Sequence, residues 1–476
     1  MSRLPPALLV LTLGACSTPT AAPAGSRAQP SSPSPPSPPA PSTDASAAAA
    51  APGPAAAEAA AGPAPEARDP DGNDDAAPTG EGAAPASGHF ERVGRPPLGL
   101  RRICDLRPYG DALYAAHANQ PLGTDGATIT RYQPDDAKTP FRVMLDWNRP
   151  GEPTRGGGGG QGFLRVHAIA GRLFVPDADP PYGGFGLSEW GTEGFVFVSD
   201  AEGKFAPLRP GHRPPGVPDA EGRAGAALLP RAYHVIDVIR YRGKLYASTG
   251  SVPPGERAWR GPSPGALHEA DASWARWTYR AGYPTPFRDG VWRLTFLVRF
   301  RDKLFAGIQD FDGREPFDFV VASPPPGAEG LGQGDLAPRR VTDHGGSLTL
   351  RWYVDRGELY WIAYERSGAV RLRATRDGET FREVALPAEA GRPTDVTRFR
   401  DALVVLTERG LYRIDGPGAP RALTTLPAKT TPFRFDDVFC GAPLAVFRNE
   451  LYAGGQRDGS PYRFVPDEAA VAPAPP

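Results

Sequence analysis

The chain has 476 residues, of which 40% are hydrophobic, and its formal net charge at pH 7 is −1. A chain this close to neutrality exerts no broad electrostatic attraction on nucleic acid or acidic lipid, so its composition gives no support to a nucleic-acid-binding role. The 57 glycines and 58 prolines exceed the usual share of a globular domain, and they are concentrated in particular segments.

The first 15 residues have the layout of a secretory signal peptide. Arg3 is followed by an apolar run that ends at Leu13 and is too short to span a membrane. Residues Leu13-Gly14-Ala15-Cys16 resemble the lipobox of bacterial lipoproteins, in which the cysteine is lipid-modified and becomes the new N-terminus. The resemblance implies a lipidated Cys16, and the alternative is an ordinary signal peptide with an incidental cysteine. Ser17 replaces the Asp that retains such lipoproteins in the inner membrane, so we expect the outer membrane, at either face.

Residues 16–88 are predicted to form a disordered stalk. From Ser17 to about Ser87 the chain consists almost wholly of Ala, Pro, Ser and Gly. Such a segment has no aromatic or branched apolar side chains with which to offset its conformational entropy. Proline keeps it extended, at about 3 Å per residue where it is polyproline-like. Residues 468–476 are likewise predicted to be a disordered tail.

A short phrase returns seven times after Arg101: an apolar residue, a pair of turn residues, and then Leu with an aromatic or aliphatic neighbour. Gly, Asp or Asn in the turn tolerates a positive φ, and alternating apolar residues precede it, so each copy predicts a β-hairpin. One or two further strands follow each copy. The repeated leucines are Leu113, Leu173, Leu245, Leu304, Leu359, Leu403 and Leu451.

The repeat predicts an all-β fold, a seven-bladed β-propeller of four-stranded antiparallel blades over residues 89–467. Successive copies are about 44 to 72 residues apart, which fits one propeller blade each. The alternative all-β fold is an array of immunoglobulin-like domains, but each of these needs about 100 residues.

The two ends of the repeat region are predicted to close the ring. The last unit, from about Phe435 to Val465, has room for three strands, and the segment His89–Val93 supplies the missing outer strand. Cys104 and Cys440 fall on the presumed innermost strands of the first and last blades, so we expect a disulfide between them, since disulfides persist in an oxidising compartment. Two buried free thiols are the alternative.

The repeat region resembles bacterial β-propellers with kelch-like or Asp-box blades. Thr375–Phe381 is similar to the Asp-box, in which Ser or Thr, Asp, Gly and an aromatic occupy a turn between outer strands, and Ser199–Phe205 is a looser copy. In that family the box braces a hairpin and is not catalytic. The resemblance therefore implies the fold and almost nothing of the function.

Candidate binding residues share one register of the repeat. The position eleven residues before each repeated Leu carries Arg102, His234, Arg293 and Arg392 in four of the seven units. On a common rim they would form a cationic mouth for a carboxylate, sulfate or phosphate. The alternative is that these arginines pair with nearby acids such as Asp105 and Asp237. None of the seven histidines has metal-ligand spacing, and we predict no metal site, cofactor or catalytic residue.

Three functions remain open at this stage. The first is a binding module, lipid-anchored and with a monomeric propeller, that recognises a glycan, peptide or protein of the envelope or exterior at the channel mouth. The second is an enzyme of the glycosidase or lyase type that uses the cationic mouth. The third is a scaffold within an envelope complex.

Overall fold

The computed structural model of the protein describes most of the chain between residues 79 and 467. The predicted signal peptide, Cys16, most of the predicted stalk and the predicted tail lie outside the described residues. Among the described residues, no helix is long and apolar enough to cross a membrane. The described residues are 79–118, 127–146, 162–177, 193–200, 203, 205–207, 228–230, 232–251, 264–272, 274, 276–286, 290, 292–310, 317–341, 346–415, 420–435 and 439–467.

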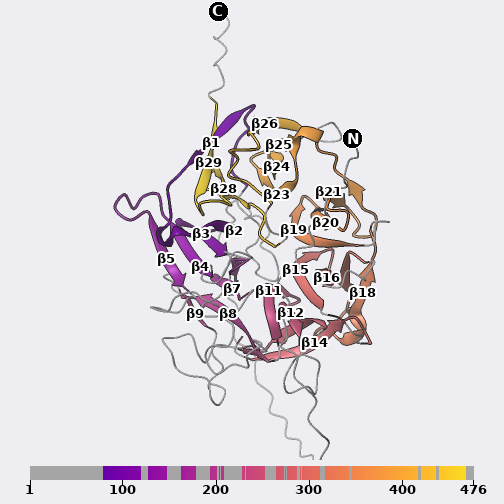
Figure 1. Cartoon of the computed structure of the whole chain (residues 1–476). Helices are drawn as coiled ribbons and strands as arrows, with labels where there is room; N and C mark the ends of the chain where they lie inside the picture. Colours follow the sequence, from indigo (N-terminus) through magenta and orange to yellow (C-terminus); the bar gives the residue numbers. More distant parts are fainter. Residues whose placement is uncertain are drawn as a thin grey trace, which may run out of the picture. The chain divides into compact units, whose positions relative to one another are not determined.

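Seven antiparallel sheets surround a common axis as the blades of a β-propeller, which confirms the predicted fold (Figure 1). Each blade begins with its innermost strand. Blade 1 comprises β2 (Arg102–Tyr109), β3 (Ala112–Ala118), β4 (Thr128–Tyr132) and β5 (Phe141–Asp146). Blade 3 comprises β11 (Ala232–Tyr241), β12 (Lys244–Ser251), β13 (Gly265–Ala270) and β14 (Trp277–Tyr283). Blade 4 comprises β15 (Trp292–Phe300), β16 (Lys303–Asp310), β17 (Phe319–Ala322) and β18 (Leu336–Arg339).

The next two blades repeat this arrangement, and three short 3-10 helices lie in the described connections. Blade 5 comprises β19 (Ser347–Asp355), β20 (Glu358–Glu365), β21 (Val370–Thr375) and β22 (Arg382–Glu383). Blade 6 comprises β23 (Pro393–Phe399), β24 (Ala402–Thr407), β25 (Gly410–Ile414) and β26 (Arg421–Thr425). The 3-10 helices are Pro97–Gly99, Gln333–Asp335 and Ala388–Ala390.

Blade 2 has an outer strand in two pieces. Its first three strands are β6 (His167–Ile169), β7 (Arg172–Pro176) and β8 (Glu193–Ser199). β9 (Phe205–Pro207) pairs with the end of β8, and β10 (Leu228–Pro230) pairs with its beginning. β9 and β10 thus lie along the same side of β8 at its two ends.

The ring closes as the sequence predicts. Blade 7 takes β27 (Leu444–Phe447), β28 (Glu450–Gly454) and β29 (Pro461–Pro466) from the end of the chain, and β1 (Gly88–Arg92) from before blade 1. β1 and β29 pair in antiparallel register from Gly88 opposite Pro466 to Arg92 opposite Tyr462. The predicted disulfide between Cys104 and Cys440 is present. Cys104 lies in β2, whereas Cys440 lies in the connection before β27 and not on the strand itself.

The two faces of the ring differ in their connections. The turns between first and second strands lie together on one face, which we call the turn face, since neighbouring turns touch: the Tyr241 hydroxyl donates a hydrogen bond of 2.5 Å to the Asp302 carbonyl. Because the strands are antiparallel, the inner strands begin on the opposite face, which we call the crossover face. The chain passes there from blade to blade.

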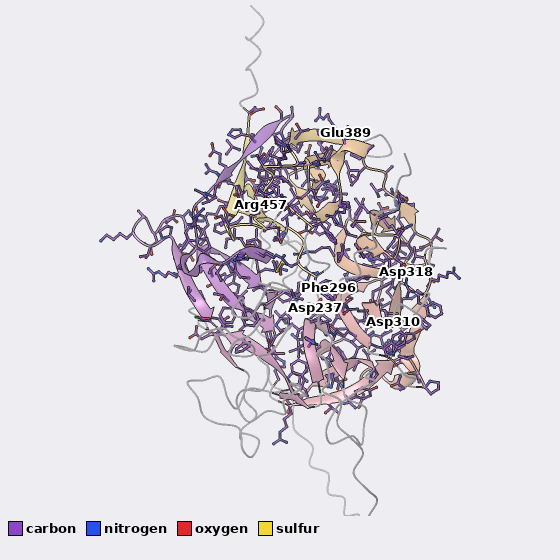
Figure 2. The ribbon with its side chains drawn as sticks, in the orientation of Figure 1. Asp237, Phe296, Asp310, Asp318, Glu389 and Arg457 are labelled. Carbon is purple, nitrogen blue, oxygen red and sulfur yellow. A yellow bond between two sulfur atoms is a disulfide. The ribbon has the colours of Figure 1, made fainter. Side chains whose placement is uncertain are left out.

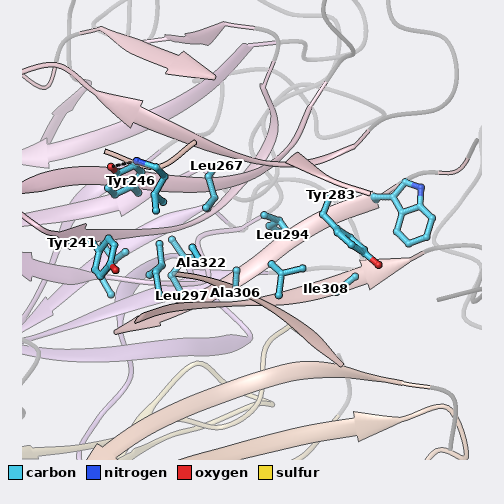
Figure 3. Packing of buried hydrophobic residues seen from close by; sticks show 14 residues of the cluster. Tyr241, Tyr246, Leu267, Tyr283, Leu294, Leu297, Ala306, Ile308 and Ala322 are labelled. Carbon is cyan, nitrogen blue, oxygen red and sulfur yellow. Dashed lines mark hydrogen bonds between the residues drawn. The ribbon is translucent and has the colours of Figure 1, made fainter. Parts of the chain in front are cut away.

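The hydrophobic core lies between consecutive blades. Every adjacent pair of blades shares one cluster of buried apolar side chains. Between blades 3 and 4, for example, Tyr241, Tyr246 and Leu267 pack against Leu294, Leu297 and Ala306 (Figure 3). Burial at about 25 cal/mol per Å² of apolar surface makes these seven interfaces the main source of stability, so each blade depends on its two neighbours.

The turn Thr375–Phe381 in blade 5, which resembles an Asp-box, braces a hairpin. Asp377 Oδ1 accepts a hydrogen bond from the Thr375 hydroxyl at 2.9 Å and from the backbone N–H groups of Glu379 and Thr380 at 2.8 Å. These hydrogen bonds hold the pKa of the Asp377 carboxyl well below its usual range. Phe381 packs edge-on against Trp361, so the box fastens the outer edge of the blade to its core.

Candidate functional site at the axis of the ring

The four side chains predicted to line the mouth lie near the starts of four inner strands, on the crossover face. Arg102 opens β2, His234 and Arg293 lie in β11 and β15, and Arg392 immediately precedes β23. The first three are buried, and Arg392 is partly exposed. The structure therefore places all four at one end of the ring, and their role in binding a ligand stays a prediction.

Arg392 has a carboxylate partner. Its Nη2 donates a hydrogen bond of 2.7 Å to Oε1 of Glu408, its Nε donates one of 2.9 Å to Oε2, and its guanidinium lies over the Phe435 ring. Burial alone would raise the pKa of the Glu408 carboxyl, but the hydrogen bonds and charge of Arg392 outweigh it and lower that pKa. For Arg392 the alternative of pairing with an acid is correct, and the acid is neither Asp105 nor Asp237.

The other rim residues take part in the backbone and side-chain contacts of their own blades. Nη1 of Arg293 donates a weak hydrogen bond of 3.4 Å to Oε1 of Gln309. The Arg102 carbonyl contacts Nδ1 of His117 at 3.1 Å, and burial lowers the pKa of the His117 imidazole to about 3. His117 is therefore neutral at physiological pH. Among the described residues, no three His, Cys, Asp or Glu side chains form a group that could hold a metal ion.

The axis of the ring contains a cluster of buried charges. From blade 5, Arg351 donates a hydrogen bond of 2.9 Å from Nη1 to Oδ1 of Asp105 in blade 1, and another from Nη2 to the Cys104 carbonyl. Nη1 of Arg165 in blade 2 lies 3.9 Å from the same carboxylate oxygen. Nε of Arg351 lies 3.9 Å from Oδ2 of Asp395 in blade 6. The pair of Arg351 with Asp105 therefore connects blades 5 and 1, which are not neighbours in the ring, and the other two contacts connect adjacent blades.

Burial and ion pairing compete at these groups. Burial alone would raise the pKa of Asp105, but Arg351 and Arg165 outweigh it, and the pKa lies below its usual value. Burial raises the pKa of Asp395, which Arg351 only partly offsets. Burial and the neighbouring charge of Arg351 lower the pKa of Arg165 to about 10. Asp105 and Arg165 are thus both ionised at neutral pH.

Three axial aspartates also brace neighbouring blades. Oδ2 of Asp105 accepts the backbone N–H of Val166 at 2.9 Å, and Oδ2 of Asp237 accepts that of Leu297 at 2.7 Å. Oδ2 of Asp395 accepts the N–H of Leu444 at 2.7 Å. Each carboxylate therefore fastens its inner strand to the following blade. Oδ1 of Asp237 also contacts Nε2 of buried His167 at 2.5 Å.

Apolar side chains fill the axis around the charges. Asp237 and Phe296 lie near the centre of the ring (Figure 2). The Arg165 guanidinium lies 4.1 Å from the centre of the Phe296 ring, and Phe296 packs edge-on against Phe439. Cys104, Cys440 and Ile236 belong to the same cluster. In the described part of the ring, side chains therefore fill the axis.

The axial cluster has a sequence signal in a different register of the repeat. The position eight residues before each repeated Leu carries, in order, Asp105, Arg165, Asp237, Phe296, Arg351, Asp395 and Pro443. Acids and arginines thus dominate a position in the middle of the inner strands. In five blades a bulge lies in the inner strand, and it turns this position towards the axis.

Neither a model of a known protein family nor a curated protein sequence matches the chain. Among solved structures, it is similar to virginiamycin B lyase from Staphylococcus aureus, with 7% identity, a TM-score of 0.46, and coverage of 79% of this chain and 99% of that one. The extracellular domain of a hybrid two-component system from B. thetaiotaomicron has 11% identity and a TM-score of 0.44, with coverage of 79% and 42%. The WD40 propeller domain of Doa1 has 11% identity and a TM-score of 0.40, with coverage of 80% and 98%. At these identities the likeness concerns the fold alone.

Proposed function

We propose that the protein is a binding module of the bacterial outer membrane, held by a lipid on Cys16, that recognises an envelope or extracellular ligand at the crossover-face mouth of its propeller. The observation that carries this proposal is the filled axis. Arg351, Arg165 and Asp105 are committed to one another and to the inner strands, so they support a rigid platform with a fixed rim. A rigid, preorganised surface loses little conformational entropy when a ligand binds.

The chemistry of the rim favours an anionic ligand. Arg102, His234 and Arg293 lie near the starts of their inner strands on the crossover face, and a guanidinium forms strong hydrogen bonds with carboxylate, sulfate or phosphate oxygens. We propose a glycan, peptide or protein that carries such a group. The disulfide at the ring closure supports the assignment to an oxidising compartment.

The anchor and the ligand are tested separately. Mass spectrometry of the N-terminal peptide from bacterial membranes is expected to show an acylated Cys16, and a Cys16→Ala variant is expected to lose the modification. A screen of acidic glycans and peptides against the detergent-solubilised full chain tests binding. Arg293→Ala is expected to abolish binding of any hit, whereas Arg409→Ala, an exposed arginine on the same face, retains it. Equal loss in both variants contradicts a site at the mouth.

A further inference from the structure

Arginines recur at one position of the turn face. The first residue of the turn between the inner two strands is Arg in five consecutive blades, 3 to 7, whereas blades 1 and 2 have Gly110 and Ala170 there. We call these five residues the turn arginines. They are Arg242, Arg301, Arg356, Arg400 and Arg448.

The turn arginines have a strained backbone conformation. Their φ angles lie between 46° and 57°, in the left-handed region that favours Gly or Asn in such a turn. Four of the five guanidiniums lie over the aromatic ring of the preceding residue, as Arg301 lies 5.7 Å from the centre of the Phe300 ring. A strained conformation that recurs with one charged side chain at an exposed turn points to a role for that side chain.

Three turn arginines are available to a partner. Arg242, Arg301 and Arg356 are exposed, and within the described part of the chain none of them forms an ion pair. Several carboxylates of the same face are already held by other cations: Asp355 by Arg398 at 2.5 Å, and Glu379 by Lys303 at 2.8 Å. Asp302, beside Arg301, is an exposed carboxylate among these turns. Glu329 and Asp377 are also exposed on this face. The turn arginines of blades 3 to 5 are therefore three cations without an ion-pair partner on a face that also carries exposed carboxylates.

The N-terminal segment reaches the ring on this same face. β1 starts at Gly88 on the turn face, and the residues before it are fastened there. The Arg400 backbone N–H donates to the Thr79 carbonyl, and the Glu81 backbone N–H donates to Oδ1 of Asn449 at 2.6 Å. Nη1 of Arg400 also donates to the Ala83 carbonyl at 3.2 Å. The described residues before β1 thus lie on the face that carries the turn arginines.

We propose that the turn face docks on the phosphate groups of anionic phospholipids. This rests on the proposed lipid anchor at Cys16, because a tether that joins the propeller at its turn face keeps that face at a high local concentration beside the membrane. Each basic residue near an anionic surface contributes about a fivefold factor to the attraction, which salt screens. The crossover-face mouth, on the opposite side of the ring, is then directed away from the bilayer.

The test is hydrogen–deuterium exchange on the lipidated full chain in two kinds of vesicle. One contains phosphatidylcholine alone, and the other contains equal parts of phosphatidylcholine and phosphatidylglycerol. Peptides over residues 241–245, 300–304 and 355–359 are expected to exchange at least about fivefold more slowly on the anionic vesicles, and about 0.5 M salt removes the difference. Equal exchange on both vesicles overturns the proposal, as does protection that appears on neutral vesicles too, which indicates an apolar contact.

A triple variant and a matched control complete the test. Arg242→Asn, Arg301→Asn and Arg356→Asn together remove three charges with a residue that tolerates positive φ, and this variant is expected to lose the protection. Asn in place of the exposed arginines 95, 101 and 409 removes the same charge from the crossover face and is expected to keep it. Exchange of the strand peptides in the same data shows whether each variant is folded. A variant that keeps the protection while folded overturns the proposal.

The experiment distinguishes failure of the lipid-anchor proposal from failure of the docking proposal. The mass of the N-terminal peptide in the same sample shows whether Cys16 is acylated. An unacylated protein that floats with anionic vesicles, and whose triple variant does not, overturns the lipid anchor and supports the docking face. An acylated protein with equal exchange on both vesicles supports the anchor and overturns the docking face.

Discussion

Arg351 of blade 5 reaches across the axis of the ring to Asp105 of blade 1, with Nη1 2.9 Å from Oδ1. Both side chains are more than nine-tenths buried. The strands that carry them are 246 residues apart in sequence, and the blades are not neighbours. The pair therefore stabilises the closed ring as a whole, in addition to the apolar interfaces between adjacent blades.

Loss of the Arg351 charge is expected to destabilise the propeller strongly. Arg351→Met leaves the Asp105 and Asp395 carboxylates buried near the axis without their shared cation, and breaking a buried ion pair in this way costs about 3–5 kcal/mol. Equilibrium denaturation of the full chain measures the loss. The matched control is Arg101→Met at an exposed position, with an expected change within about 0.5 kcal/mol. A loss in Arg351→Met no larger than in the control contradicts a structural role for the axial cluster.

Two axial aspartates are expected to give opposite pH dependences. The folded-state pKa of Asp105 lies below the unfolded value, so its contribution to stability is present above about pH 4 and is lost as the pH falls through the folded pKa. The folded-state pKa of Asp395 is raised, so stability from this group is lost as the pH rises above about 4 through that pKa. The cost of Asp105→Asn therefore grows as the pH rises from the folded-state pKa of Asp105 towards about 4, whereas the cost of Asp395→Asn shrinks above about pH 4.

Denaturation of the two variants and the wild-type chain at several pH values measures these slopes. Because both substitutions are Asp→Asn in the same position of the repeat, each is the control of the other. If the destabilisation by both substitutions changed with pH in the same direction, the pKa values of Asp105 and Asp395 would not be shifted in opposite directions.

Reduction of the disulfide between Cys104 and Cys440 is expected to lower the free energy of unfolding by about 2–5 kcal/mol. The bond closes a loop of 336 residues in sequence separation, so it removes many conformations from the unfolded chain. The comparison is denaturation with and without reductant, and the Cys104→Ala, Cys440→Ala double variant is the control that no longer responds to reductant. An equal response of both proteins contradicts the prediction.

Local sequence patterns made the blades and the closure of the ring predictable from the sequence. The repeated hairpin places turn residues at a fixed distance from Leu, and the structure has left-handed turns there, as at Arg242 and Gly243. The last unit has room for only three strands, and the segment before the first unit that was predicted to provide the fourth forms β1 (Gly88–Arg92) beside β29. Each of these features depends on residues near one another in sequence or on the need to complete a sheet.

The axial cluster was not predicted, for a geometric reason. In a regular strand, every second side chain faces the same side, and a prediction of which residues face the axis relies on that alternation. A bulge between Ile103 and Asp105 inserts an extra residue and shifts it. The same irregularity occurs before Asp237, Arg351 and Asp395, so residues beyond the bulge face the opposite way from what the alternation indicates. Which charges meet on the axis depends further on the curvature of the whole ring, which no local pattern contains.

The outer strand supplied by the N-terminal segment is expected to be needed for blade 7. Phe90 on β1 packs edge-on against Phe433, with 4.8 Å between ring centres, and against Phe464 on β29 at 5.5 Å. Phe90→Ala is expected to destabilise the chain by about 2–4 kcal/mol, at the lower end of the range for core phenylalanines because the ring is only partly buried. Hydrogen exchange of the peptide over residues 461–466 is expected to accelerate, since these residues lose a firmly held partner strand. His89→Ala, an exposed neighbour on the same strand, is the control and leaves that exchange unchanged, and equal acceleration in both variants would show that Phe90 does not hold the strand in place.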